Sequence, residues 1–394
     1  ANGASLGGRL LSLRPFVLIG LVSYAWYLWH WPMFAFFRIV EGREPGVLEA
    51  WILIAVSLGL AFASWQYLEK PVRRRDTIST RSLATVAVSG TILLAAASAM
   101  IVLTRGLLHR FPDQMARLDR GAIRAHKAVR CEPIIADGKP LPHICTLVGG
   151  EPGSRSVVVW GDSHAGAYAP GLVVAGLANS ATVYQATRVN CPPLLGVLAG
   201  QGTAALECRD YNARVAGLIG TLAITDVIIA MRWPVYVSDN RYSRLPAAAR
   251  EHQLRDSQSR PGIPATENDE NREVVRRGRS RTVASLKAAG VRGWLTEPMP
   301  EPGFDVPGEM ARIMMRGADL RSLPPLLQSR HRADNSFIIS VIAKLKDDGL
   351  VHVLDPATRL CDSVRCRLHD EWRPLYSDDN HLSTDGAKFV AVMF

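Results

Sequence analysis

The stretch Val159-Trp160-Gly161-Asp162-Ser163-His164-Ala165-Gly166 decides the fold of the larger part of this 394-residue chain. It closes a run of β-branched residues, 156–160, and leads into a helical pattern over residues 168–179. A serine between a strand and a helix lies at the carboxyl edge of a parallel sheet, where open α/β folds bind ligands. Its backbone N–H then lies at a helix N-terminus, which favours a developing oxyanion. The stretch therefore predicts that Ser163 is a nucleophile on an α/β sheet.

Segments typical of strands and of helices alternate around this stretch. Apolar and β-branched runs occur at residues 156–160, 182–185, 226–231, 291–296 and 350–354. Helical patterns occur at residues 168–179, 281–289 and 335–346. This alternation predicts a mostly parallel, flavodoxin-like sheet with helices on both faces, in three layers. The polar segment 235–273 interrupts the order, and we expect it to be either a lid over the site or a flexible insertion.

A second motif, near the C-terminus, supplies partners for Ser163. The string Tyr376-Ser377-Asp378-Asp379-Asn380-His381-Leu382-Ser383 carries an acid and a histidine in D-x-x-H spacing. A serine hydroxyl is a weak nucleophile until a base takes its proton, and an acid must hold that base in the correct tautomer. We therefore expect His381 to be the base and Asp378 to be the acid that orients it.

Three alternatives to this assignment stay open. Asp379 is a rival for the orienting acid, since it neighbours Asp378 in the same loop. His164 is a rival for the base, because it directly follows Ser163. The third alternative is that Ser163 only caps a helix and that His381 is an ordinary surface residue.

The two motifs resemble those of the SGNH family. Residues 161–164 resemble its G-D-S-[LH] block rather than the G-x-S-x-G elbow of α/β-hydrolases, and residues 378–381 resemble its last block. Two intermediate blocks, which carry a glycine and an asparagine as oxyanion donors, are replaced here by Arg188-Val189-Asn190-Cys191-Pro192-Pro193 and by Ile229-Ala230-Met231-Arg232-Trp233. Both departures resemble the SGNH domains that are fused to acyltransferase-3 proteins.

The missing blocks leave the oxyanion donors open. We expect the backbone N–H of Ser163 to be one donor. Arg232 or the backbone around Asn190 is the candidate for another. For Arg232, a surface salt bridge is the alternative.

Three apolar segments precede this domain, at residues 16–37, 51–68 and 83–103. Each is near the roughly 20 residues that a membrane-spanning helix needs. Basic residues in short loops stay in the cytoplasm, and they stand here at Arg9, Arg14, Lys70, Arg73, Arg74 and Arg75. The sequence thus predicts transmembrane helices over 1–105, a periplasmic connector over 106–151 and an SGNH-type domain over 152–394 outside the membrane. Arg105 and Arg110 argue mildly against this orientation.

Two strings in the membrane segment resemble the last helices of the acyltransferase-3 family. They are Ser23-Tyr24-Ala25-Trp26-Tyr27-Leu28-Trp29-His30-Trp31-Pro32 and Tyr67-Leu68-Glu69-Lys70-Pro71-Val72-Arg73. An aromatic belt at the membrane interface is the alternative for the first string. The resemblance implies that further N-terminal acyltransferase-3 helices belong to the protein and handle the acyl donor. His30, inside an apolar span, is expected to face the protein interior and is a candidate for acyl transfer.

All six cysteines follow residue 105. They are Cys131, Cys145, Cys191, Cys208, Cys361 and Cys366. An even number without C-x-x-C spacing, outside the membrane, predicts disulfides rather than a metal site. We expect sequence neighbours to pair, with buried thiols as the alternative. The net charge of +10 is assigned to the membrane flanks and the solvated surface, so no nucleic-acid partner is expected.

The resemblance implies a bacterial inner-membrane O-acyltransferase, most often an O-acetyltransferase. Its partners would be membrane lipid, an acyl donor, and a glycan acceptor such as lipopolysaccharide O-antigen, peptidoglycan or exopolysaccharide. The implied donor is acetyl-CoA, used by the membrane part, and no bound cofactor is expected. Ser163 would carry the acyl group. A periplasmic carbohydrate esterase with the same triad, and a glycan-binding module with a vestigial triad, are the alternatives.

Overall fold

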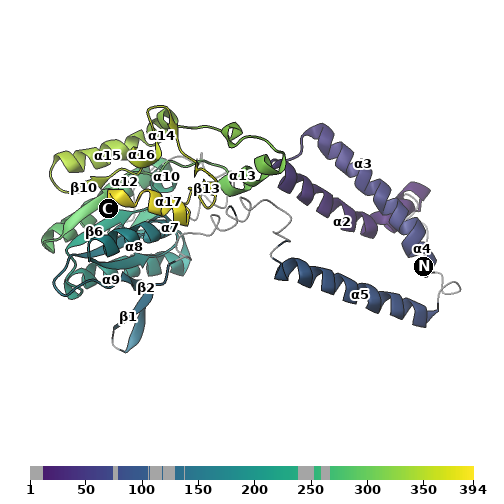
Figure 1. Ribbon diagram of the computed structural model, residues 1–394, viewed down its shortest axis with the longest axis horizontal. Helices are drawn as coiled ribbons and strands as arrows, with labels where there is room; N and C mark the ends of the chain where they lie inside the picture. The colour runs from purple at the N-terminus through teal and green to yellow at the C-terminus, as the bar shows by residue number, and fades with distance from the viewer. Residues whose placement is uncertain are drawn as a thin grey trace. The chain divides into compact units, whose positions relative to one another are not determined.

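Figure 1 shows the computed structural model of the chain. The structure describes residues 12–73, 79–104, 106, 118, 129–136, 138–237, 253–258 and 267–394. The chain divides into two compact units, the first comprising Ala1–Pro112 with Met314–Gly317 and the second comprising Asp113–Ile313 with Ala318–Phe394. Some features predicted from the sequence lie outside the described residues: Arg9, Arg74, Arg75, Arg105, Arg110, most of residues 105–128, and residues 238–252 and 259–266.

The first unit is helical. Its elements are α2 (Arg14–Glu41), α3 (Val47–Ser64), the π-helix η1 (Trp65–Glu69), α4 (Lys70–Arg73) and α5 (Thr80–Leu103). Proline in the first turn of α2 suits a position whose N–H has no helical partner. Gly42 ends α2 in the left-handed conformation, with φ 70°, which glycine adopts without steric cost.

Two of the described helices are long and apolar enough to cross a membrane, Val47–Val72 and Thr80–Leu103. They contain the predicted spans 51–68 and 83–103. The third predicted span, 16–37, lies within α2, which is long enough but less apolar because tyrosines, tryptophans, His30 and Pro32 occupy its middle. The third span and the orientation of the chain in a membrane therefore stay predictions.

Helices α2 and α3 pack through small residues and indole hydrogen bonds. Ala25 and Ala61 are buried between them. The indole N–H of Trp26 donates to the Ser57 hydroxyl at 2.9 Å, and that of Trp29 donates to the Ser64 hydroxyl at 2.8 Å. These bonds join the aromatic string of α2 to α3, so two of its tryptophans serve helix packing as well as any interfacial role.

A seven-stranded sheet forms the centre of the second unit, in the order β1-β2-β4-β3-β6-β8-β10. Its strands are β1 (Glu132–Ala136), β2 (Lys139–Val148), β3 (Ser156–Gly161), β4 (Thr182–Thr187), β6 (Asp226–Ala230), β8 (Arg292–Thr296) and β10 (His352–Leu354). The five strands from β4 to β10 are parallel. Because their carboxyl ends share one edge, residues that follow these strands meet there, as the alternation in the sequence predicted.

Helices cover both faces of this sheet, which gives the predicted three layers. They include α8 (Ala169–Ala178), α9 (Gly202–Thr221), α12 (Glu267–Ala288), α15 (Ser336–Asp347) and α17 (Thr384–Phe389). Val158 and Trp160 of β3 are buried in one core with residues of α9, α12 and α15. Helix α8 packs against α17, where Gly171 lets the two backbones approach. Successive residues of a strand point to opposite faces of the sheet, so β3 contributes side chains to the packing on both faces.

The connector predicted over residues 106–151 is not free of structure. Strands β1 and β2 form an antiparallel hairpin inside it, and β2 continues the sheet by pairing with β4. Prolines at 133, 140 and 142 hid the strand pattern in the sequence. Proline is tolerated in strands near a sheet edge, where a missing N–H costs little.

Three disulfides connect sequence neighbours, which confirms the predicted pairing. Cys131 with Cys145 links the β1–β2 hairpin, and Cys191 with Cys208 links the turn after β4 to α9. Cys361 with Cys366 closes a short loop after β10.

The structure describes residues 235–237, 253–258 and 267–273 of the insertion 235–273. Strand β7 (Leu254–Asp256) lies inside it and pairs with β5 (Val197–Ala199). The buried Asp256 carboxylate accepts from the Arg281 guanidinium of α12 at 3.1 Å. The described part is thus fixed to the domain, and the choice between a lid and a flexible insertion stays open for the rest.

Candidate active site

Ser163 lies where β3 ends and α7 (Ser163–Ala167) begins. Two residues before it, Gly161 pairs with Ala230 of β6, and a Cβ on Gly161 would lie 1.7 Å from the Ala230 carbonyl oxygen. Only glycine fits at this position. Asp162 caps α7, because its carboxylate accepts the His164 N–H at 2.9 Å. The turn therefore presents Ser163 at the carboxyl edge of the sheet.

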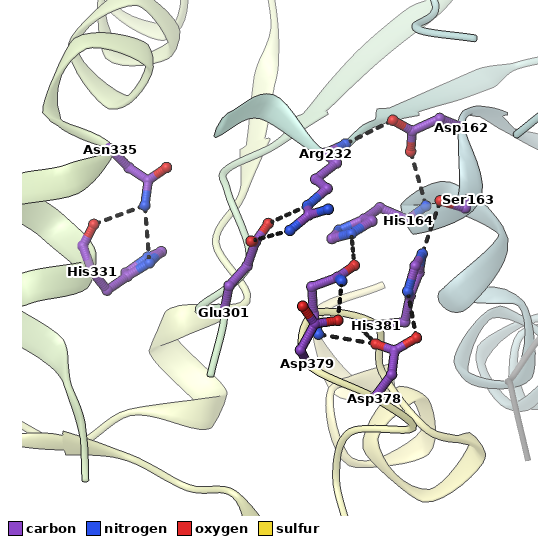
Figure 2. A network of polar contacts seen from close by, with 11 residues as sticks. Asp162, Ser163, His164, Arg232, Glu301, His331, Asn335, Asp378, Asp379 and His381 are labelled. Atoms are coloured by element: carbon purple, nitrogen blue, oxygen red, sulfur yellow. Dashed lines mark hydrogen bonds and ion pairs between the residues drawn. The ribbon is translucent and has the colours of Figure 1, made fainter. Parts of the chain in front are cut away.

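The structure brings the three predicted triad residues together (Figure 2). The Ser163 hydroxyl lies 2.9 Å from Nε2 of His381. Nδ1 of the same ring lies 2.9 Å from Oδ2 of Asp378. A base that contacts the nucleophile through one nitrogen and an acid through the other is the arrangement that activates a serine. The geometry can therefore support acyl transfer through Ser163.

The carboxylate of Asp378 is held in the ionised form. Burial alone raises its pKa, but hydrogen bonds from the His381 ring and from two backbone N–H groups outweigh this, so the pKa of Asp378 lies well below its usual value. Those N–H groups belong to Asn380, at 2.9 Å, and to His381, at 2.7 Å. An ionised Asp378 keeps the proton of neutral His381 on Nδ1, which leaves Nε2 free to accept the serine proton.

The rival acid and base have other partners. Asp379 accepts the side-chain N–H of Asn380 at 2.5 Å rather than one from His381. His164 is buried, and its Nε2 lies 2.9 Å from Oδ1 of Asn380. The geometry thus favours Asp378 over Asp379 and His381 over His164.

Arg232 forms a partly buried salt bridge rather than a surface one, and the other N–H groups of its guanidinium stay candidates for the oxyanion. Its Nε and Nη2 bind the buried Glu301 carboxylate at 3.0 and 2.8 Å, and its backbone N–H donates to Asp162 at 2.9 Å. Burial lowers the pKa of Arg232, but the bond to Glu301 outweighs this and raises it. The backbone N–H therefore holds the loop after β6 to the nucleophile turn, and two guanidinium donors bind the segment after β8.

Asn190 lies in the turn after β4, with a left-handed backbone at φ 56°. The turn starts beside the site, because the Arg188 N–H donates to the Gly161 carbonyl at 3.0 Å. In the described part of the chain, no hydrogen bond joins Asn190 to Ser163. The N–H groups of this turn stay candidates for the second oxyanion donor.

His30, the candidate in the membrane part, lies within α2 and is half-buried. Its Nδ1 lies 3.1 Å from the Trp26 carbonyl oxygen of the preceding helical turn. This contact holds the ring against its own helix, and a role of His30 in acyl transfer stays a prediction.

Sequence reasoning missed several residues that support the site. Asn380 lies inside the D-x-x-H motif and was given no role, although a buried amide needs hydrogen-bond partners. Glu301 and Tyr236 carry no local signal, because their partners Arg232 and Asp162 are 69 and 74 residues away. Among the described residues, no cluster of three His, Cys, Asp or Glu side chains could hold a metal ion.

The known proteins that match the chain include two curated relatives from different organisms. The chain is 35% identical over 74 residues to O-acetyltransferase OatA of Staphylococcus aureus (strain NCTC 8325 / PS 47), covering 18% of this chain and 12% of that protein. It is 30% identical over 80 residues to Peptidoglycan O-acetyltransferase OatA of Listeria monocytogenes serovar 1/2a, covering 20% and 13%. The chain therefore spans about an eighth of the length of these relatives.

A solved structure and a family model also match. The periplasmic domain of a lipopolysaccharide acetyltransferase from Salmonella ser. Paratyphi A is 17% identical with a TM-score of 0.43, and the match covers 61% of this chain and 82% of that one. The model of the family described as "SGNH domain (fused to AT3 domains)" matches residues 130–394. Since this is more than half of the sequence, the chain belongs to the family of SGNH domains that are fused to AT3, or acyltransferase-3, domains.

Proposed function

We propose that this protein is a membrane-bound O-acetyltransferase that passes an acetyl group through Ser163 to a hydroxyl of an extracytoplasmic glycan. The observation that carries the proposal is the hydrogen-bonded chain from Ser163 through His381 to Asp378 in an SGNH domain of the AT3-fused family. Two matched relatives are named O-acetyltransferases, and the name of one adds peptidoglycan. These names support acetyl as the group and a glycan as the acceptor.

In the first half of the reaction, Ser163 attacks the acyl carbonyl while Nε2 of His381 takes its hydroxyl proton. The carbonyl oxygen becomes an oxyanion, for which the Ser163 N–H is one donor and the turn at Asn190 offers another. Collapse of this intermediate breaks the bond to the donor's leaving group, which takes the proton from His381. The product is an acetyl ester on Ser163.

In the second half, a sugar hydroxyl attacks this ester. His381 now takes the sugar's proton and returns it to the Ser163 oxygen when that oxygen leaves. Asp378 stabilises the imidazolium in both halves. Water in place of the sugar would make the same site an esterase, so the acceptor, rather than the triad, separates the two activities.

The membrane part supplies the acyl group in this proposal. Two candidate spans and the fusion of the family to AT3 domains support a location in the bacterial inner membrane with the SGNH domain in the periplasm. Acetyl-CoA on the cytoplasmic side is the proposed donor, handled by acyltransferase-3 helices. A hydrolase would need no such supply, which favours transfer over hydrolysis.

The proposal is tested by complementing a deletion strain with the full-length protein carrying Ser163→Ala, and by measuring O-acetyl groups on surface glycans by NMR. Ser340→Ala is the matched control, because Ser340 is exposed on α15 and its hydroxyl donates to the Phe337 carbonyl of the same helix. We expect loss of O-acetylation for Ser163→Ala alone. Unchanged acetylation would remove Ser163 from the reaction, and increased acetylation would establish the esterase.

A further inference from the structure

Two side-chain hydrogen bonds, not one, join the nucleophile turn to the loop that carries the triad histidine (Figure 2). The first is the reacting contact between Ser163 and His381, at 2.9 Å. The second links the neighbouring residues, since Nε2 of His164 lies 2.9 Å from Oδ1 of Asn380. Two consecutive residues of the turn, Ser163 and His164, thus bond two consecutive residues of the loop. The second bond involves no atom that reacts.

The direction of the second bond follows from the amide of Asn380. Its Nδ2 donates to Oδ1 of Asp379 at 2.5 Å, so its Oδ1 is the atom that faces His164. An amide oxygen only accepts, and Nε2 of His164 must therefore carry a hydrogen. The loop is fixed from its other side as well, because the Gly303 N–H donates to the Asp379 carbonyl at 2.9 Å.

The His164 ring is kept neutral. It is 3% exposed, and its centroid lies 4.7 Å from that of His381. Burial lowers the pKa of His164 well below its usual value, and the charges of His381 and Arg232 lower it further. Among the acidic groups around it, Asp378 opposes the shift but less strongly than burial drives it. Asp379 lies behind Asn380, and Asp162 lies in the same turn as His164.

A neutral His164 suits the chemistry of its neighbour. His381 must become an imidazolium when it takes a proton from Ser163, and a second positive ring at 4.7 Å would oppose that step. Nε2 of His164 cannot accept the serine proton, because it already carries the hydrogen that it donates to Asn380, and the Ser163 hydroxyl instead contacts Nε2 of His381.

We propose that His164 is a positioning residue for acyl transfer: its bond to Asn380 holds the loop of Asp378 and His381 at reacting distance from Ser163. This inference rests on the proposed function of Ser163. It gives a role to the fourth residue of the G-D-S-H block and to Asn380, neither of which touches the reacting atoms.

Turnover of p-nitrophenyl acetate by the full-length protein in detergent tests the inference. His164→Leu keeps much of the side-chain volume but removes the donor, and we expect kcat to fall about 10²-fold with KM unchanged, as for a catalytic group misplaced by about 1 Å. His164→Gln places an N–H near the position of Nε2, and we expect it to restore most of the lost rate. His352→Gln, at an exposed histidine of β10, is the control and should leave kcat unchanged.

If His164 had only a structural role, both His164 variants would have a lower melting temperature, and their kcat values would be the same. Asn380→Leu removes the acceptor and should match His164→Leu, and the double variant should be no slower than either single one, because both break one bond. If His164→Leu does not fold, Asn380→Leu alone carries the comparison. Full activity of a folded Leu variant, equal loss in Gln and Leu variants, or additive losses would overturn the inference.

Failure of the underlying function gives a different result. Ser163→Ala must abolish turnover and leave no acetylated peptide in the mass spectrum. If it does not, the role of Ser163 fails whatever His164 does. If Ser163→Ala is inactive while both His164→Leu and Asn380→Leu are fully active, only the positioning role fails.

Discussion

Exchanging each acid of the loop at residues 378–381 for its amide distinguishes Asp378 from Asp379 as the partner of the base. Asp378→Asn replaces the carboxylate oxygen that lies 2.9 Å from Nδ1 of His381. Asp379→Asn changes a side chain whose described contact is with Asn380, also inside the loop. The two substitutions are chemically identical and adjacent, so each is the control for the other.

The size of the effect follows from the ion pair formed during the reaction. When His381 is protonated, it faces the Asp378 carboxylate at a charge separation of about 4 Å, which is worth about 4 kcal/mol at an effective dielectric constant of about 20. One factor of ten in rate corresponds to about 1.4 kcal/mol, so Asp378→Asn should slow kcat by about 10³-fold. The amide can also donate to Nδ1 and favour the wrong tautomer, which acts in the same direction.

Asp379→Asn should stay within a few-fold of the wild type, because it changes no charge in contact with His381. The assay is turnover of p-nitrophenyl acetate by the full-length protein in detergent, with the melting temperature of each variant measured alongside. A large loss for Asp379→Asn with normal activity for Asp378→Asn would reverse the assignment. Normal activity for both would refute the triad.

Two further predictions concern the stability of the second unit. Burial lowers the pKa of His331 to about 4. Between pH 6.5 and 4 the histidine is therefore protonated in the unfolded state but not in the folded state. The free energy of unfolding should fall by about 3 kcal/mol as the pH drops through this range. Across that range, the melting temperature of His331→Leu should depend less on pH than that of the wild type or of the exposed variant His352→Gln. An unchanged pH dependence in His331→Leu would contradict the conclusion that His331 causes the loss of stability at low pH. Gly161→Ala should destabilise by about 3 kcal/mol through its clash with the Ala230 carbonyl, whereas Gly217→Ala, within α9 with nothing within 4 Å, should stabilise by up to about 1 kcal/mol; equal melting temperatures would contradict this contrast.

Local patterns were enough to find the sheet and its candidate nucleophile. The β-branched run before Ser163 and the small residues around it describe a strand, a tight turn and a helix within a dozen positions. The D-x-x-H spacing likewise places Asp378 and His381 in one loop. The hairpin β1–β2 was not predicted, because prolines weaken its strand pattern in the sequence. In the structure, pairing of β2 with β4 stabilises it.

The sequence by itself determined the parallel α/β sheet, the disulfide pairing of neighbouring cysteines and the candidate triad, because each rests on residues close in the chain or on a motif with a fixed place in the fold. Tertiary structure alone decided which acid contacts His381, and it removed three donors of Arg232 from the oxyanion question by pairing them with Glu301 and Asp162. It also showed the hydrogen bond between His164 and Asn380 beside Ser163, which joins residues 216 positions apart. Such contacts depend on which strand ends lie close together in space. Neither the periodicity of the sequence nor the spacing of its motifs predicts which ends these are.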